Sequence, residues 1–243
     1  MNEKYELTEE FKEIETLREG WLQKIKVYRI RALRAFADVK IGDLGGFVET
    51  KQNLSNMGNA WVYGNAEVYD NARVCDNAWV CGDAEVCGDA WVRDNAEVCD
   101  NARVCDNARV RDNAWVCGDA WVCDNARVCN NARVYGNARV CDNAKVYGNA
   151  EVCGDAEVYD NANIFWCSSI GSRHATTTMF RNKDNGITVT CGCFMGTLEE
   201  FAERVEKEHG ENIFGKEYKL LIELAKIHFG LQDETKGEEE NGI

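Results

Sequence analysis

The chain has 243 residues, a formal net charge of −14, 13 cysteines and no proline. The negative charge argues against general nucleic-acid binding, because phosphate backbones attract basic proteins. The sequence shows neither a run of roughly 18 apolar residues nor a secretory leader, which predicts a cytoplasmic protein that does not enter a membrane. Free thiols are therefore expected, since the cytosol is reducing.

Residues 1–57 are predicted to form an N-terminal cap. Apolar residues at helical spacing, among them Phe11 and Ile14, predict a helix within residues 1–20. Residues 24–34 alternate between apolar and polar side chains, as in a strand. A cap is expected here because the repeats that follow would otherwise begin with an unpaired strand edge.

Residues 58–165 repeat one six-residue phrase, [Gly/Asp/Asn]-[Asn/Asp]-Ala-x-Val-y, 18 times without a gap, with Ile164 in place of Val in the last copy. Side chains alternate across a strand, so Ala and Val share one face of the segment Ala-x-Val-y while x and y share the other. The first two positions hold residues that tolerate turns and positive φ. Each copy therefore predicts one short strand followed by one corner.

Three strands and three corners would close one coil of 18 residues, so 18 copies predict about six coils. Coils stacked about 4.8 Å apart would form a prism roughly 30 Å long, filled by Val and Ala. The fold class predicted is mainly β, a parallel β-helix flanked by two smaller regions. Outward side chains 18 residues apart would lie in rows along its three faces.

The repeated phrase resembles that of the hexapeptide-repeat proteins, [Leu/Ile/Val]-Gly-x-x-[Ser/Thr/Ala/Val]-x. The run Val62-Tyr63-Gly64-Asn65-Ala66-Glu67 matches at Val and Ala, but has Tyr63 where that family prefers Gly. The resemblance implies a left-handed β-helix of triangular section that is frequently trimeric. The flanks, residues 42–55 and 171–201, look like those of uncharacterised hexapeptide-repeat proteins of bacteriophages and prophages, which implies a phage origin.

Residues 166–231 are predicted to form a small α+β domain of two strands and two helices. Thr197 is the expected N-cap of the first helix, with Glu200 closing a capping box. The elements in chain order are strands at 175–180 and 187–193, followed by helices at 197–210 and 216–229. Residues 232–243 form an acidic, polar tail that is predicted to be disordered.

One predicted outer face is basic. Arginine side chains bind phosphates and carboxylates through paired N–H groups, and an indole stacks on planar groups. The candidate residues for an anion or nucleotide on this face are Trp91, Arg93, Arg109, Arg111 and Arg127. Alternatively, aspartates at the preceding corners, such as Asp106 and Asp124, neutralise these arginines locally.

A second outer face is aromatic and too apolar to lie in water uncovered. Its candidate interface residues are Trp61, Tyr63, Trp79, Trp115 and Tyr135. They predict a homo-oligomer, either a dimer or a trimer, or a surface covered by the cap. A stacking platform for carbohydrates or bases is the alternative.

The third outer face carries an unbroken row of thiols, Cys87, Cys105, Cys123 and Cys141. Their expected spacing of about 4.8 Å is within the Cα range of disulfides, and thiolates also bind soft metals. The favoured interpretation is a row of reduced filler residues. The acidic corners lack the calcium-binding repeat phrase, so no metal and no cofactor are predicted.

All three histidines follow the repeats, whereas hexapeptide-repeat acyltransferases resemble one another in using a histidine near the solenoid. A divergent acyltransferase using His174 is therefore the enzymatic alternative. The polar segment with Ser172, Arg173 and His174 could instead hold a phosphate. A zinc set, weak in its spacing, is Cys167, His174, Cys191 and Cys193.

These observations favour binding over catalysis. The sequence predicts a capped β-solenoid that captures a host protein or a small anionic ligand such as a nucleotide. The resemblance to phage proteins implies an accessory or anti-defence role. The remaining alternatives are the acyltransferase and an inert spacer or virion component.

Overall fold

The computed structural model describes residues 3–18, 20–160 and 163–231. The chain forms two compact units, Met1–Asn161 and Ala162–Ile243. Among the described helices, none has both the length and the apolar character needed to cross a membrane. The acidic tail at 232–243 lies outside the described residues.

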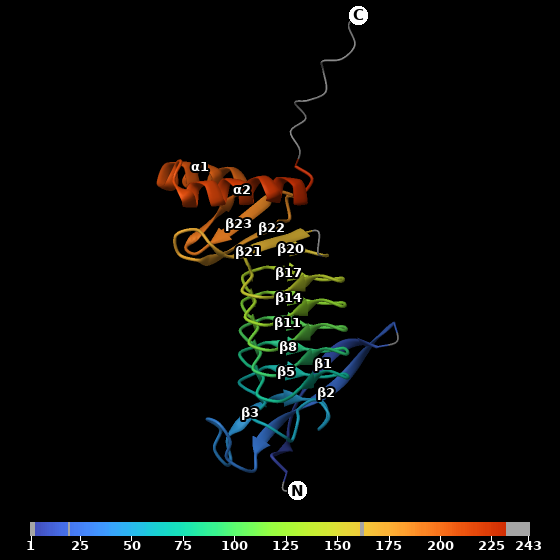
Figure 1. The fold of residues 1–243 in the computed structure, drawn as a ribbon. Helices are drawn as coiled ribbons and strands as arrows, with labels where there is room; N and C mark the ends of the chain where they lie inside the picture. Colours follow the sequence, from blue (N-terminus) through green and yellow to red (C-terminus); the bar gives the residue numbers. More distant parts are fainter. Residues whose placement is uncertain (1–2, 19, 161–162, 232–243) are drawn as a thin grey trace, which may run out of the picture. The chain divides into compact units, whose positions relative to one another are not determined.

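The repeats form a three-sided parallel β-solenoid (Figure 1). Within residues 58–160 each copy contributes one two-residue strand, at its x and Val positions. The strands are β4 (Trp61–Val62), β5 (Glu67–Val68), β6 (Arg73–Val74), β7 (Trp79–Val80), β8 (Glu85–Val86), β9 (Trp91–Val92), β10 (Glu97–Val98), β11 (Arg103–Val104), β12 (Arg109–Val110), β13 (Trp115–Val116), β14 (Trp121–Val122), β15 (Arg127–Val128), β16 (Arg133–Val134), β17 (Arg139–Val140), β18 (Lys145–Val146), β19 (Glu151–Val152) and β20 (Glu157–Val158).

Every third strand joins the same sheet, so the predicted coil of 18 residues is confirmed. The first face is the sheet β6-β9-β12-β15-β18 and the second face is β4-β7-β10-β13-β16-β19. The third face contains β5-β8-β11-β14-β17-β20. The last copy departs from the pattern, because Ile164 begins a strand of the second unit.

The core of the solenoid is a stack of alanines and valines. Every repeat Ala and Val from Ala60 to Val158 is at most 1% exposed. The coils pair in register, and the backbone N–H of each x residue donates to the Ala carbonyl of the next coil, as from Arg109 to Ala126 at 2.9 Å. The prediction of a dry Val and Ala interior is therefore confirmed.

The first position of each corner has a positive φ in every copy from Gly58 to Gly154. Only Gly, Asp and Asn occupy it, because these residues tolerate the left-handed region. Each aspartate also offers a second contact: Asp112 Oδ2 accepts the backbone N–H of Asn130, at 3.0 Å. Aspartate at this position therefore ties one corner to the equivalent corner of the next coil.

The second corner position forms ladders of side-chain amides. In the longest one each Asn Nδ2 donates to the Oδ1 of the next, at 3.0 to 3.1 Å. Its members are Asn59, Asn77, Asn95, Asn113, Asn131 and Asn149. Such ladders stabilise stacked parallel strands, which explains why this position is always Asn or Asp.

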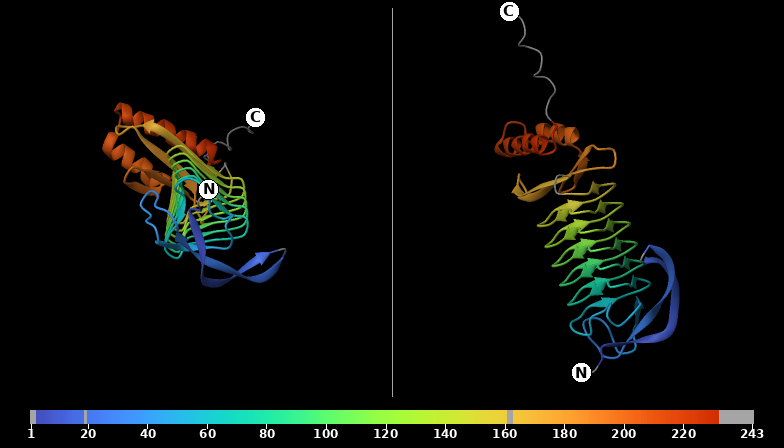
Figure 2. Two further views of the ribbon diagram at one scale, coloured as in Figure 1. Left: turned by 90° about the horizontal axis from the view of Figure 1, so that it is seen from below. Right: turned by 90° about the vertical axis from the view of Figure 1, so that its right-hand side faces the viewer.

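The N-terminal region corrects one prediction, since residues 5–18 form a strand where a helix was expected. β1 (Tyr5–Arg18) and β2 (Trp21–Ala32) form an antiparallel hairpin beside the first coils (Figure 2). β3 (Leu44–Val48) pairs with β2 and, in parallel, with β5, so the hairpin continues the sheet of the third face. Backbone pairing within this sheet outweighs the helical spacing of Phe11 and Ile14; Ile14 packs inward, whereas Phe11 is exposed.

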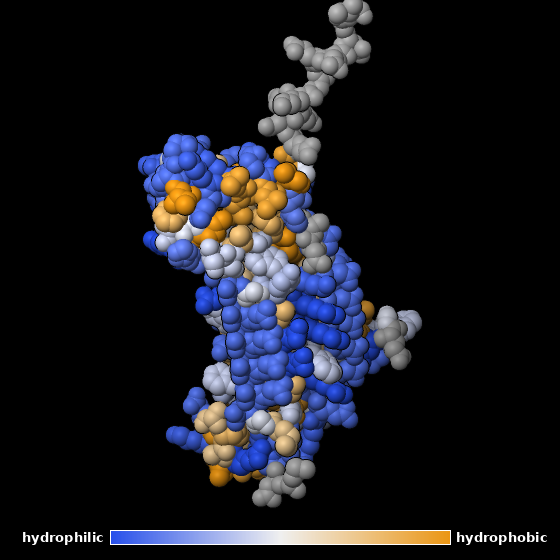
Figure 3. All heavy atoms as spheres, viewed as in Figure 1, coloured by the Kyte–Doolittle hydropathy of each residue, from blue (hydrophilic) through white to orange (hydrophobic). Residues whose placement is uncertain are grey.

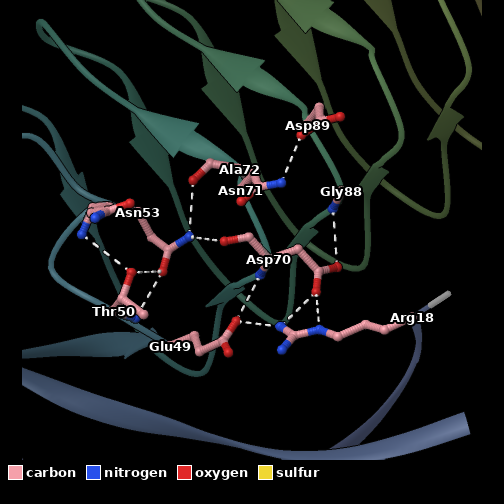
Figure 4. A network of polar contacts seen from close by, with 10 residues as sticks. Arg18, Glu49, Thr50, Asn53, Asp70, Asn71, Ala72, Gly88 and Asp89 are labelled. Carbon is pink, nitrogen blue, oxygen red and sulfur yellow. Dashed lines mark hydrogen bonds and ion pairs between the residues drawn. The ribbon is translucent and has the colours of Figure 1, made fainter.

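The hairpin covers the start of the third face through an apolar cluster of Ile25, Val27, Phe47 and Tyr69. A polar network closes its edge (Figure 4). The Arg18 guanidinium contacts Glu49 at 2.5 Å and Asp70 at 2.6 Å. In the same network Asn53 Nδ2 donates to the backbone carbonyls of Asp70 and Ala72.

The second unit is a four-stranded antiparallel sheet with two helices packed on it. Its elements are β21 (Ile164–Ile170), β22 (Ala175–Arg181), β23 (Ile187–Cys191), β24 (Phe194–Thr197), α1 (Leu198–His209) and α2 (Ile213–His228). The sequence predicted β22, β23 and both helices, but missed β21 and β24. β21 overlaps the end of the repeat pattern, and β24 is only four residues long. The capping box of Thr197 and Glu200 is confirmed.

Overpacking the solenoid core is expected to destabilise it. In Ala108→Leu the longer side chain has no space in the core, where Ala108 and the equivalent alanines of adjacent coils, Ala90 and Ala126, are fully buried; this predicts a loss of about 1–3 kcal/mol in the free energy of unfolding. Chemical denaturation measures this loss. Arg109→Leu, which places the same side chain on the outer surface, is the control and should change stability by less than about 0.5 kcal/mol. Equal effects would contradict the packed axis.

Gly171→Ala should destabilise the second unit. Gly171 has a φ of 71°, and an added Cβ would collide with the Tyr218 hydroxyl. Gly230→Ala is the matched control, since Gly230 has a φ of 69° but open space around its Cα. Thermal unfolding should show a loss for Gly171→Ala that exceeds that of Gly230→Ala by at least about 1 kcal/mol. Losses of the same size would mean that Tyr218 moves aside freely.

Candidate functional site

The basic residues predicted from the sequence lie together on the first face of the solenoid. We call this surface the arginine stripe; it consists of Arg73, Trp91, Arg93, Arg109, Arg111, Arg127 and Lys145. Trp91, Arg109 and Arg127 occupy the same position in β9, β12 and β15 and stack in register. Their side chains are exposed, with Trp91 at 40%. The sheet therefore holds these groups one coil apart in a single line.

Trp91 lies between two guanidinium groups. The Arg73 guanidinium is 5.8 Å from the indole centroid and that of Arg109 is 5.9 Å from it. Contacts of this kind are attractive because the ring face is electron-rich. They hold the indole along the stripe, where its exposed surface can stack on a planar ligand.

Only part of the arginine stripe is neutralised locally. Arg93 lies 3.6 Å from Asp94, and Arg111 lies 4.0 Å from Asp112. Among the described ion pairs, none involves the three exposed arginines of the stripe, which are Arg73, Arg109 and Arg127. The stripe thus presents unneutralised guanidinium groups on an otherwise acidic protein.

Among the described ion pairs, none joins Arg73, Arg109 or Arg127 to a corner aspartate that precedes the first face. Asp106 Oδ2 accepts the backbone N–H of Asp124 at 3.5 Å, and Asp124 Oδ2 accepts that of Asp142 at 3.3 Å. Asp70 binds Gly88 N–H and Arg18 of the hairpin. These carboxylates connect successive coils, and the described ion pairs do not include the neutralisation of the arginines by the preceding corner that the sequence offered as an alternative.

A hollow lies at the N-terminal end of the arginine stripe. It encloses about 400 Å³ and is bounded by the Trp91 indole, Arg73 and the polar side chains of Gln52 and Ser55. The last two residues come from the N-terminal region, which sequence reasoning assigned only to capping. Their hydroxyl and amide groups add hydrogen-bonding partners beside the indole.

The second predicted polar segment borders a pocket of about 270 Å³ in the second unit. Ser172 and Arg173 line it, but His174 does not; its side chain is exposed in a turn with a φ of 48°. Sequence reasoning missed Arg204 and His209, which α1 contributes to the same pocket. The only signal in the sequence for Arg204 and His209 was their helical spacing within the predicted helix.

The aromatic row on the second face is partly used inside the chain. Trp61 is 1% exposed, because Tyr5 and Phe36 pack against its indole at 6.2 and 5.3 Å between ring centroids. Trp61 is therefore unavailable to a second subunit. Half-buried members of the predicted interface on the surface of the second face are Tyr63, Trp79, Trp115 and Tyr135.

The surface in Figure 3 is mainly hydrophilic along the solenoid, and apolar groups gather on the helices of the second unit. Exposed aliphatic side chains of α2 include Leu220, Leu224 and Ile227. Sequence reasoning missed this surface, because the helical pattern alone does not show which apolar side chains a neighbouring sheet covers.

The cysteine row on the third face is not a set of free thiols. A disulfide joins Cys123 to Cys141, whose Cα atoms are 4.7 Å apart. This bond corrects the expectation of reduced filler residues for Cys123 and Cys141, whereas Cys87 and Cys105 are free thiols. The closest metal-type donors in the described part of the chain are two groups, Cys99, Asp100 and Cys117 within 4.8 Å, and Asp124 with the two bonded cysteines. The zinc set that the sequence offered as an alternative, with Cys191 and Cys193, is not among these groups in the described residues.

Cys99 has an unusual environment for a thiol. Hydrogen bonding with Cys81 and an N–H donated by Trp115 outweigh partial burial and lower the pKa of Cys99 to about 7. Elsewhere in the repeats, burial and the adjacent Asp76 raise the pKa of Cys75 to about 11. The two thiols occupy the same position of the repeat, so their neighbours cause the difference.

Alkylation by iodoacetamide should separate these two thiols. Because the thiolate is the nucleophile, the reaction rate of Cys99 should rise as the pH increases through about 7 and then level off. At pH 7 Cys75 should react at least about tenfold more slowly, since its pKa is about 11. Peptide mapping by mass spectrometry over pH 5–9 measures both rates. Parallel pH profiles would contradict the assigned environment of Cys99.

Comparison with known families agrees with this architecture. Residues 66–82, 102–118, 126–142 and 132–148 match the sequence model of a family described as the YdcK beta solenoid repeat. A search of curated proteins gives no match. The matched segments all lie in the solenoid, where three parallel sheets repeat every 18 residues. The chain is therefore a β-solenoid repeat protein.

Proposed function

We propose that this protein is a non-catalytic binding solenoid whose arginine stripe captures a small anionic ligand with a planar group, such as a nucleotide. The observation that supports this most directly is the exposure of Arg73, Arg109 and Arg127 without carboxylate partners among the described ion pairs. Trp91 in the same line supplies a stacking surface. The phosphate would bind the guanidinium forks and the base would stack on the indole.

The spacing of the solenoid suits this ligand. Adjacent coils place Arg109 and Arg127 about 4.8 Å apart along the stripe, so two guanidinium groups can contact one phosphate or neighbouring phosphates. Like charges held one coil apart repel each other, and a bound anion relieves that repulsion. In the pocket of the second unit, by contrast, Arg204 is already paired with Glu208. The stripe is therefore the better anion site.

The proposal extends to the biological setting. The resemblance of the flanking segments to phage proteins supports an accessory or anti-defence role in the host cytoplasm, in which capture of a nucleotide signal or of a host protein would protect the phage. The half-buried aromatic side chains Tyr63, Trp79, Trp115 and Tyr135 support a dimer or trimer through the second face.

Catalysis is the alternative. An acyltransferase would rely on His174, whose side chain is exposed in a turn and does not line the neighbouring pocket. Binding of acetyl-coenzyme A that His174→Ala abolishes would favour this alternative over the binding function. A spacer or virion component would bind neither ligand.

Calorimetric titration with ADP tests the binding function. Arg109→Ala should weaken ADP binding by about tenfold or more, since a charge-assisted contact to phosphate is lost. Trp91→Ala should weaken ADP but not inorganic pyrophosphate, because only ADP carries a ring to stack. Both variants should keep the melting temperature, as these side chains are exposed.

Arg139→Ala is the matched control for this experiment. Arg139 occupies the same repeat position on the third face and lies over Trp121, at 5.5 Å from its ring centroid. The substitution Arg139→Ala removes the same charge from the same repeat position, but on a face outside the arginine stripe. ADP binding should therefore change less than about twofold. Equal weakening by both variants would show a general charge effect, and no ADP or pyrophosphate binding by the intact chain would reject the anion site.

A further inference from the structure

The second face carries a row of three thiols, Cys81, Cys99 and Cys117, on consecutive coils. The strands that precede them are in register, because Glu97 pairs with both Trp79 and Trp115. Backbone hydrogen bonds of 2.9 and 3.0 Å fix Cys81 and Cys99 at the spacing of one coil. This spacing, about 4.8 Å, is within the Cα range of disulfides.

The third face shows that this geometry accommodates a bond. Cys123 and Cys141 occupy the same position of the repeat, 18 residues apart, and are joined with a Cα separation of 4.7 Å. The strands before them, β14 and β17, keep the ordinary register. A disulfide between coils therefore requires no shift of the backbone, and the row on the second face has the same backbone arrangement.

Cys99 is the central sulfur of the row on the second face. The indole Nε1 of Trp115 donates to its Sγ at 3.2 Å, and the free thiols of Cys81 and Cys117 lie one coil away on either side. Donors of this kind stabilise a thiolate. Cys99 is half-buried and open to small solutes, whereas Cys117 is only 7% exposed.

A comparison with Cys105 on the third face explains why Cys99 is singled out. Cys105 accepts a similar hydrogen bond from Trp121 Nε1 at 3.0 Å. One of its two stacked neighbours, Cys123, is already bonded to Cys141. Both neighbours of Cys99, in contrast, are free thiols.

We propose that Cys99 is a modification site for hydroperoxides, and that Cys81 resolves its oxidised form as a disulfide between coils. The Cys99 thiolate attacks the terminal oxygen of ROOH; an S–O bond forms, the O–O bond breaks, and the leaving alkoxide takes a proton to give ROH. The Cys81 sulfur then attacks the sulfenic acid. The S–S bond forms, and the departing hydroxide takes the Cys81 proton to give water. Two thiols are oxidised and one peroxide is reduced.

This site is separate from the proposed anion site, because the thiol row is on the second face and the arginine stripe on the first. Cellular thiols would reverse the bond by exchange. Oxidation would join two coils on the aromatic face without altering the stripe, so the two proposals can fail independently.

The experiment uses the full chain with the Cys123–Cys141 disulfide intact and the remaining cysteines as free thiols, and exposes it to limiting hydrogen peroxide. Cleavage after arginine places Cys99 alone in peptide 94–103 and Cys129 alone in peptide 128–133. Cys129 is the matched control, since it has the same repeat position but Arg111 and Tyr147 as stacked neighbours. Cys99 should lose its free thiol at least about tenfold faster than Cys129.

Two variants test which thiol bonds to Cys99 and why Cys99 reacts faster than Cys129. Cys81→Ser should leave a Cys99 sulfenic acid that dimedone traps, and the disulfide linking peptides 74–93 and 94–103 should disappear. Trp115→Phe removes the N–H donor but keeps the ring, and should slow the reaction of Cys99 several-fold without loss of melting temperature. Equal rates for Cys99 and Cys129 would overturn the proposal, and a Cys99–Cys117 bond in the unmodified chain would overturn the role of Cys81.

Discussion

The stacking of each Ala and Val on its equivalents in the next coil is the constraint on which this structure depends. These residues are at most 1% exposed throughout the solenoid, and the same 18-residue step aligns the backbone hydrogen bonds of three sheets. A larger side chain inside would separate the coils, and a missing one would leave a void. The interior therefore permits almost no variation, which is why Ala and Val recur without exception through the coils.

The corners must also repeat at the 18-residue step, and they do so through backbone conformation and polar contacts between coils. They need a residue that accepts positive φ, and an aspartate there also accepts a backbone N–H of the next coil. The side-chain amides beside it form ladders along the corner. Much of the negative charge of the repeats is thus committed to the fold. In the described ion pairs, the exposed arginines Arg73, Arg109 and Arg127 of the first face are consequently not joined to the aspartates that the sequence suggested for them.

Function is then confined to the outward positions, which the fold leaves free to vary. The three faces differ in chemistry although their backbones are alike: guanidinium groups with an indole on the first, aromatic groups and thiols on the second, and a disulfide on the third. Because residues 18 apart lie in contact, each face acts as a row of repeated groups. A ligand that spans two coils meets two such groups at a fixed spacing.

The sequence by itself determined a solenoid of short strands with Ala and Val inside, because a strict six-residue period places these two residues on one face of every strand. The three-sided section was implied by the resemblance to hexapeptide-repeat proteins, and the three sheets of the structure confirm it. The sequence also determined the capping box at Thr197. Only the tertiary structure decided that residues 5–18 form a strand, that Trp61 is covered by Tyr5 and Phe36, and that Arg204 and His209 meet Arg173. These features depend on contacts between segments without a shared period, and local spacing does not specify which segments meet.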